Sequence, residues 1–273
     1  MKFTARRPQT NVNVTPVSPL KEFFILAGSL LGLVIGVYLI LGLAVDLIVP
    51  RLSPSLEKKM AKPFLKAFSI DNGPKEMTGF VQDLVDGICN RCTGLPYDFK
   101  VHIKKGSAIN AAALPGGHIV VFTGLLEKMN SENELVFVLA HELGHYAHRD
   151  HLRGVGRAIV LMALSVFLTG PDNGVNDILS QGLNITELRF SRDQELWADL
   201  FALDILNCYY GYVTGCTDFF EKIPKENDPG KFGHYFASHP ENQRRIDQLN
   251  DVLQEKNYVM GKPMPLPGGL FNQ

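Results

Sequence analysis

The sequence predicts an α+β chain that is mostly helical, with a small β-sheet and an N-terminal transmembrane helix. Apolar residues recur at helical spacing in several segments, alternating strand patterns fall between residues 99 and 123, and an uncharged apolar run begins at Phe23. With 273 residues, 45% of them hydrophobic, the chain can bury one large core. We therefore expect one folded domain with appendages.

The predicted segments follow one another without internal repeats. They are a tail over 1–22, a transmembrane helix over 23–49, a linker over 50–74, a folded domain over 75–255 and an irregular tail over 256–273. The formal net charge of -1 argues against nucleic-acid binding, because neutralising phosphates takes a clustered basic surface.

The run from Phe23 to Val45 contains no charged residue and is long enough to cross a hydrocarbon core of about 30 Å as a helix. It is longer than the apolar core of a signal peptide, so we expect a retained anchor. Gly28, Gly32 and Gly36 share one helical face, which would allow close helix-helix approach and a homo-oligomer.

Basic residues flank this helix on both sides, so the positive-inside rule gives nearly a tie. They are Lys2, Arg6, Arg7 and Lys21 before it, and Arg51, Lys58, Lys59, Lys62 and Lys66 after it. The short N-terminal tail favours an internal N-terminus with the domain outside the cytoplasm, and a cytoplasmic domain is the alternative.

The four cysteines permit two local disulfides or none. Cys89 and Cys92 have C-x-x-C spacing, and Cys208 and Cys216 are the other two. A second metal site at Cys89 and Cys92 would need two further ligands that no nearby residues supply.

Two segments could touch a membrane surface. Residues 56–68 mix lysines with apolar residues, which predicts either a surface-lying or an ordinary linker helix interrupted by Pro63. The apolar run Ala158 to Thr169 has only a dozen residues, so we expect a buried or interfacial helix beside the active site rather than a span. The alternative is that it dips into the bilayer.

The folded domain is expected to begin with an amphipathic helix over 75–90, followed by about three strands. Phe99 to Ile103 alternates, and Ala111 to Leu114 is joined by a Pro-Gly-Gly turn to His118 to Thr123. Ser131 and Glu134 form a capping-box pattern before a buried helix. Further helices are predicted over 191–207 and from about Pro240.

The segment His141-Glu142-Leu143-Gly144-His145 is H-E-x-x-H on the predicted buried helix. Histidines four residues apart share one face and can bind one Zn²⁺ per chain. Zinc lowers the pKa of bound water, and Glu142 can take the water's proton and pass it to the leaving amine. The pattern therefore predicts peptide hydrolysis.

Two candidates for the third ligand remain from the residues alone. His151 fits the outer positions of H-E-x-x-H-x-x-G-x-x-H, but His148 replaces the glycine that turns the chain back, so His148 and His151 are expected at the surface. Glu195 and Asp199 share a helical face, so Glu195 could bind zinc while Asp199 accepts a hydrogen bond from a ligand histidine.

Four segments together resemble the zinc metallopeptidase family that includes HtpX, BepA and the CAAX prenyl endopeptidase. They are Asn110 to Gly117 with the following strand, HELGH, SRDQELWAD over 191–199, and Ser238-His239-Pro240 with Arg245-Ile246. The resemblance implies a zincin-like metalloprotease domain over 75–255 with Glu195 as third zinc ligand and Asp199 beside it. One predicted span, where those relatives have several, argues against prenyl-protein processing.

The resemblance also implies a substrate edge at the strand after the Pro-Gly-Gly turn, with Asn110, Gly116, Gly117 and His118 near an extended peptide. It suggests a protease for misfolded or membrane and envelope proteins in a bacterial inner membrane, with a periplasmic domain. The non-proteolytic rival is a zinc-bound scaffold or chaperone, which an intact Glu142 disfavours.

His239 has two expected roles: an imidazole that donates to the oxyanion, or one that sits near zinc and limits access. A loop histidine before a helix cap is the alternative. Arg245 is expected to stabilise the same region through a salt bridge.

Overall fold

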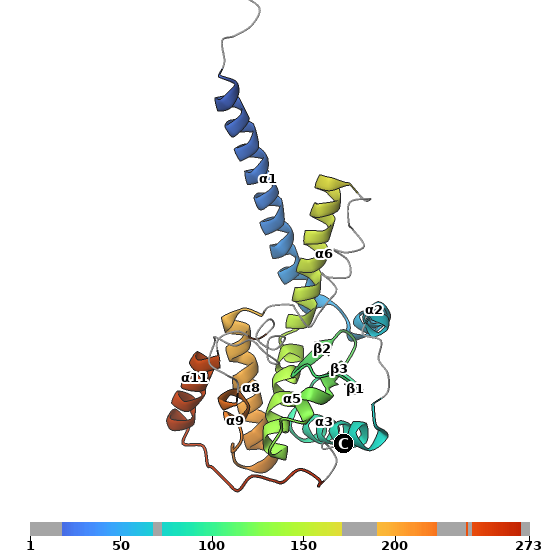
Figure 1. Cartoon of the computed structure of the whole chain (residues 1–273), viewed down its shortest axis with the longest axis vertical. Coiled ribbons are helices and arrows are strands. Elements are labelled where there is room, and N and C mark those ends of the chain that lie inside the picture. Colours follow the sequence, from blue (N-terminus) through green and yellow to red (C-terminus); the bar gives the residue numbers. More distant parts are fainter. Residues whose placement is uncertain (1–17, 68–72, 171–189, 223–238, 240–241, 269–273) are drawn as a thin grey trace, which may run out of the picture.

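The computed structural model describes residues 18–67, 73–170, 190–222, 239 and 242–268 (Figure 1). Its helices are α1 (Pro19–Ile48), η1 (Val49–Arg51), α2 (Pro54–Ala67), α3 (Lys75–Cys92), α4 (Thr123–Leu126), α5 (Glu132–Ala147), α6 (Asp150–Thr169), α8 (Arg192–Tyr210), α9 (Asp218–Glu221) and α11 (Asn242–Glu255). Its strands are β1 (Lys100–Lys104), β2 (Ala111–Leu114) and β3 (His118–Phe122). The predicted mostly helical α+β class is confirmed, while Pro240 lies outside the described residues.

Helix α1 extends away from the folded domain, with α6 beside it (Figure 1). None of its residues is buried, and its length and hydropathy are those of a membrane span. The glycine face at Gly28, Gly32 and Gly36 has no neighbour within 4 Å, and oligomerisation through it stays a prediction.

Helix α6 differs from the expectation of a short, buried or interfacial helix. It has 20 residues because the polar segment from Asp150 joins the apolar run in one helix. By length and composition it also qualifies as a membrane span, and none of residues 158 to 168 in its apolar part is fully buried. By this criterion α6 is a second candidate span beside the predicted one.

The three strands form a sheet in the order β1-β3-β2. Strand β3 pairs in parallel with β1 and antiparallel with β2, with Val120 opposite both His102 and Ala112. The strand after the Pro-Gly-Gly turn is therefore central, and the expectation that it forms the substrate edge is wrong. Because the glycine turn folds β2 back on β3 while β1 takes the other side, β2 is the edge strand beside α5.

Helix α5 runs through the core, with α3, α8 and one face of the sheet around it. Its contact with α8 is close because Gly144 has no side chain: a Cβ there would lie 2.8 Å from the Cα of Ala198. Two small residues thus let two metal-site helices approach each other, so their side chains can share one site.

Helix α2 covers the opposite face of the sheet and continues through Pro63. Glu57, Ala61 and Phe64 are buried at helical spacing, and Phe64 packs with Leu114 and Val120. The four lysines of α2 are exposed; they are Lys58, Lys59, Lys62 and Lys66. The helix is therefore amphipathic, with its buried face on the sheet.

The start of α5 carries half of the predicted capping box. The Ser131 hydroxyl accepts from the backbone N–H of Glu134 at 3.2 Å, as expected. The Glu134 carboxylate instead accepts from the Asn130 N–H at 2.8 Å and pairs with Lys222. The Glu134 carboxylate, which local spacing assigned to the cap, is therefore paired with Lys222, a residue distant in sequence.

The disulfide joins Cys92 to Cys208, and Cys89 and Cys216 are free. The prediction of local pairs or none is wrong because α3 and α8 lie side by side, which brings together cysteines 116 residues apart in sequence. The bond ties the end of α3 to the helix that carries Glu195.

Candidate metal centre

Two histidines of α5 face each other inside the domain. The Nε2 atoms of His141 and His145 lie 3.1 Å apart, and both side chains are buried. The Nδ1 of His141 lies 2.9 Å from Oδ1 of Asp199, and the Nδ1 of His145 lies 3.2 Å from Oδ2 of Asp150. Because a carboxylate only accepts, both Nδ1 atoms carry the proton and donate. The two Nε2 atoms then present lone pairs to each other, which fits a cation between them.

Helix α8 brings a carboxylate to the same point. Its first turn is fixed by a capping box between Ser191 and Gln194. One turn in, Glu195 is buried with Oε2 3.6 Å from His141 Nε2 and Oε1 3.7 Å from His145 Nε2. Two imidazoles and a carboxylate are a donor set that zinc takes in catalytic sites.

His239 completes the group from the segment before α11. It is buried, with Nδ1 2.9 Å from Glu195 Oε1 and 3.3 Å from His141 Nε2. Its Nε2 lies 3.8 Å from Oε1 of Glu142. Ligand atoms of His141, His145, Glu195 and His239 all lie within 4.8 Å of one another. The structure thus brings His239 to the other predicted ligands and to the predicted base.

The charges around these residues favour a cation. Four buried carboxylates, Glu142, Asp150, Glu195 and Asp199, surround the histidines, and Arg245 is the buried guanidinium among them. Buried charges need compensation, so an excess of carboxylates attracts a divalent cation. Burial alone lowers the pKa of His145, but hydrogen bonding to Asp150 and the charges of Glu195 and Glu142 raise it above its usual value.

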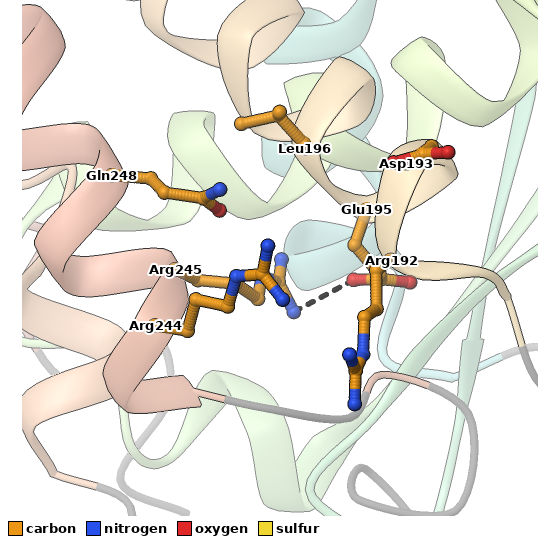
Figure 2. Close-up of a pocket in the computed structure, with 7 residues that line it drawn as sticks. All are labelled: Arg192, Asp193, Glu195, Leu196, Arg244, Arg245 and Gln248. Carbon is orange, nitrogen blue, oxygen red and sulfur yellow. Dashed lines mark ion pairs between the residues drawn. The ribbon is translucent and has the colours of Figure 1, made fainter.

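Arg245 holds two of these carboxylates from the α11 side. Its NH1 lies 2.7 Å from Glu195 Oε2, and its Nε and NH2 lie 2.7 and 2.6 Å from the two oxygens of Asp199. Figure 2 shows this guanidinium at the pocket between α8 and α11, next to Glu195. Burial would raise the pKa of Glu195, but the charges of His239 and Arg245 hold it below its usual range. The predicted salt bridge of Arg245 is present.

His148 and His151 lie apart from the cluster. His148 is exposed, as expected. His151 is fully buried, with Nε2 2.9 Å from Oε1 of Glu57, so its predicted surface position is wrong. The chain turns at Arg149, whose φ is 56°, and starts a new helix beneath α2. The turn carries His151 to Glu57 rather than to His141 and His145.

The four predicted substrate residues lie around β2. Asn110 is buried and its Oδ1 accepts from the Ala111 N–H at 2.9 Å. Gly116 and Gly117 form the turn with φ of 85° and 86°, which glycine adopts without strain. His118 is buried against His102 at 2.8 Å, and burial with the charge of His102 lowers its pKa to about 4. The His118 side chain therefore pairs with His102 across β1 and β3, and its substrate role stays a prediction.

Asp150 and Phe190 contact the ligand His145 and were not predicted from the sequence. Asp150 accepts from His145 and from Gln194, whose Nε2 lies 2.7 Å from Oδ1. Phe190 stacks on the His145 ring with centroids 3.9 Å apart. Asp150 lies five residues after His145, and the turn at Arg149 brings it back to that ring. An acidic residue shortly after H-E-x-x-H was the available signal.

Comparison with known proteins identifies the family. The sequence model of peptidase family M48 matches residues 78–253, which is more than half of the chain. The chain belongs to peptidase family M48. The suspected family is thereby confirmed, and M48 membership makes the chain a metalloendopeptidase of a zinc-dependent family.

Similar M48 proteins come from bacteria and from mitochondria. Metalloprotease YcaL of Escherichia coli is 32% identical over 60% of this chain and 65% of its own length. Metalloprotease LoiP of the same organism is 29% identical over 62% of this chain and 68% of its own length. Mitochondrial metalloendopeptidase OMA1 of Arabidopsis thaliana is 35% identical over 54% of this chain but only 30% of its own length. The similarity therefore leaves much of OMA1 unmatched.

Proposed function

We propose that this M48 protein is a membrane-anchored zinc endopeptidase that cuts misfolded or membrane and envelope proteins, with one Zn²⁺ held by His141, His145 and Glu195. The observation that supports it most is the pair of Nε2 atoms 3.1 Å apart, each on a ring whose Nδ1 faces a carboxylate. A hydrogen bond from Nδ1 to a carboxylate fixes the orientation of each ring and leaves its Nε2 lone pair available to a metal.

Each remaining residue has a role in this proposal. Bound zinc would supply Lewis-acid activation of water and of the scissile carbonyl. Glu142 follows His141 on α5 and takes the proton from water, then gives it to the leaving amine. Asp199 holds the His141 ring, and Arg245 fixes both Asp199 and Glu195. His239 lies between Glu195 and Glu142 and donates a hydrogen bond to the oxyanion.

An extended peptide would add to the sheet at β2. This strand is the edge in the order β1-β3-β2, and it lies against the helix that carries H-E-x-x-H. Backbone pairing at such an edge accepts many sequences, which suits a protease for misfolded chains. Asn110 and the turn at Gly116 and Gly117 hold the two ends of β2 and so position the edge. His118 supports it from β3.

The anchor and the disulfide together support an extracytoplasmic domain, in a bacterial inner membrane. Helix α1 is long and apolar enough to span. The bond between Cys92 and Cys208 is of a kind that persists in oxidising compartments. This combination supports the proposal of a periplasmic domain.

The test compares the full chain in detergent micelles as wild type, Glu142→Gln, Glu195→Gln and, as a matched control, Asp193→Asn in the exposed first turn of α8. Zinc content and casein cleavage are measured on each. We expect wild type and control to hold one zinc per chain and to cut. Glu142→Gln should keep zinc and lose about 10²-fold or more in rate, because the general base is gone. Glu195→Gln should lose zinc.

Two results would overturn the assignment. Full zinc content and activity in Glu195→Gln would remove Glu195 from the ligand set. Zinc binding without cleavage in wild type would favour a zinc-bound scaffold instead.

A further inference from the structure

The apolar part of α6, residues 158 to 168, is not fully buried by the described residues, although α1 lies beside the helix. The helix buries His151, Leu152 and Val155 against the domain, but no residue from 158 to 168 is buried. Phe167, near its end, is 85% exposed, and Leu161 is 53% exposed. A side chain as large and apolar as Phe167 is more stable in an apolar environment than in water. The apolar side chains of this part of α6 are therefore more stable in an apolar environment than in water.

Helices α1 and α6 are fastened together where they leave the domain. Asp46 of α1 binds Arg157 of α6 with oxygens 3.0 and 3.1 Å from NH2, and Arg153 lies 3.5 Å from the same carboxylate. A Cβ on Gly156 would lie 2.6 Å from Val45, so the backbones approach closely there. Figure 1 shows both helices extending away from the same side of the domain and diverging from each other above this contact. These contacts hold the two helices together at the level of Asp46 and Arg157.

The charges change sharply at the level of this contact. Above it, α6 has no charged residue from Ala158 to Thr169, and α1 has none from Phe23 to Val45. On the domain side, Arg149 and Arg153 stand at the start of α6, and α2 with its exposed lysines lies beside the domain (Figure 1). Cations below an apolar pair match the anionic headgroups and the hydrocarbon of a lipid bilayer.

We infer that α6 inserts into the lipid bilayer beside α1 and ends near its middle. This rests on the membrane anchoring in the proposed function. The 11 residues from 158 to 168 rise about 16 Å as a helix, and the hydrocarbon core is about 30 Å thick. Lipid acyl chains are the occupant of the face that carries Leu161 and Phe167.

Insertion of α6 fixes the metal centre relative to the membrane. The first residue of α6 is Asp150, which binds the His145 ring. Arg157 comes seven positions after Asp150 on α6. Asp150, which binds the His145 ring, therefore lies about 10 Å along the helix from the contact between Arg157 and Asp46. The bilayer and the site are thereby joined by one continuous helix, which holds the site close to the membrane surface.

Tryptophan quenching by brominated lipid tests the insertion in the full chain. Trp197→Phe removes the single native tryptophan, and Phe167→Trp adds a reporter on α6. Leu33→Trp on α1 is the lipid-facing reference, and Met260→Trp, at an exposed position of the C-terminal segment, is the aqueous one. Each variant is placed in phosphatidylcholine vesicles with and without brominated acyl chains, and its zinc content verifies the fold.

We expect brominated lipid to quench Phe167→Trp to the same fraction as Leu33→Trp and to leave Met260→Trp unchanged. Ile159→Trp should be quenched more by bromines near the headgroup, and Phe167→Trp more by bromines near the chain ends. Quenching of Leu33→Trp without quenching of Phe167→Trp overturns the inference, whether water or a second protein copy covers α6. If Leu33→Trp is also unquenched, both the membrane anchoring by α1 and the insertion of α6 are contradicted. Zinc-dependent cleavage in micelles then still tests the peptidase activity separately.

Discussion

Two clusters of histidine and carboxylate lie on either side of the turn at Arg149. They differ in whether their hydrogen-bond donors and acceptors are matched. In the metal cluster, His141, His145, Glu195 and His239 bring ligand atoms within 4.8 Å of one another. In the Glu57 cluster, formed by Glu57, Tyr97, Gly116 and His151, donors and acceptors are matched. Glu57 Oε1 accepts from Gly116 N and His151 Nε2, both at 2.9 Å, and Oε2 accepts from the Tyr97 hydroxyl at 2.8 Å.

The comparison teaches that composition does not distinguish a metal site from a structural one. Both clusters are buried and both contain a histidine bound to a carboxylate. The Glu57 cluster is complete without an ion, whereas the metal cluster sets two nitrogen lone pairs against each other. Removing a residue of the Glu57 cluster should therefore lower the free energy of unfolding, whereas removing a residue of the metal cluster should weaken metal binding.

The largest effect is expected for Glu57→Ala. Breaking a buried pair leaves His151, the Tyr97 hydroxyl and the Gly116 N–H unsatisfied and costs about 3–5 kcal/mol of unfolding free energy. Denaturant unfolding in micelles measures this, with zinc content as second readout. Glu76→Ala, at an exposed glutamate of α3, is the control. Loss of zinc from a folded Glu57→Ala protein would mean that the two clusters act as one site.

The next effect is expected for Asp150→Asn. The amide keeps the shape but removes the charge that holds the His145 ring, so zinc affinity should fall by about 10–100-fold. Competition with a zinc chelator gives the affinity. Asp193→Asn, an exposed neighbour of the site on α8, should keep wild-type affinity. Equal affinities for the two variants would remove Asp150 from the metal site.

A smaller effect is expected for Tyr97→Phe. It deletes one hydrogen bond to a charged group and should lower the unfolding free energy by about 1.5 kcal/mol. Tyr258→Phe is the matched control, because that hydroxyl binds the exposed Asp204. In a Glu57→Gln background, Tyr97→Phe should cost less; an unchanged cost would show that the hydroxyl does not act through Glu57.

The smallest effect is a pH dependence that arises in the Glu57 cluster. Burial raises the pKa of Glu57, but hydrogen bonding and the charge of His151, with Gly116 and Tyr97, hold it below its ordinary value of 4.5. A lowered folded pKa stabilises the fold above pH 4.5, and that stability is lost as the pH falls through the folded pKa. Melting temperatures from pH 6 to 3 should therefore fall more steeply in wild type than in Glu57→Gln; parallel curves would contradict it.

Local spacing predicted much of this fold and of the candidate site. The uncharged run of α1, the amphipathic α3 and the three strands follow from periodicity over a few residues. His141 and His145 share a face because four residues make about one helical turn. Glu195 and Asp199 gained their assignment from resemblance, since Glu-x-x-x-Asp on a helix is common.

The sequence by itself determined the class of fold, the M48 motifs and the chemistry they predict. Only the tertiary structure decided that β3 is central, that Cys92 pairs with Cys208, that Asp150 holds His145 and that His151 belongs to Glu57. Spacing along one helix or strand is fixed by backbone geometry. Partners across elements depend on how helices cross and where the chain turns, as at Gly144 and Arg149, and those choices are made by packing of the whole core.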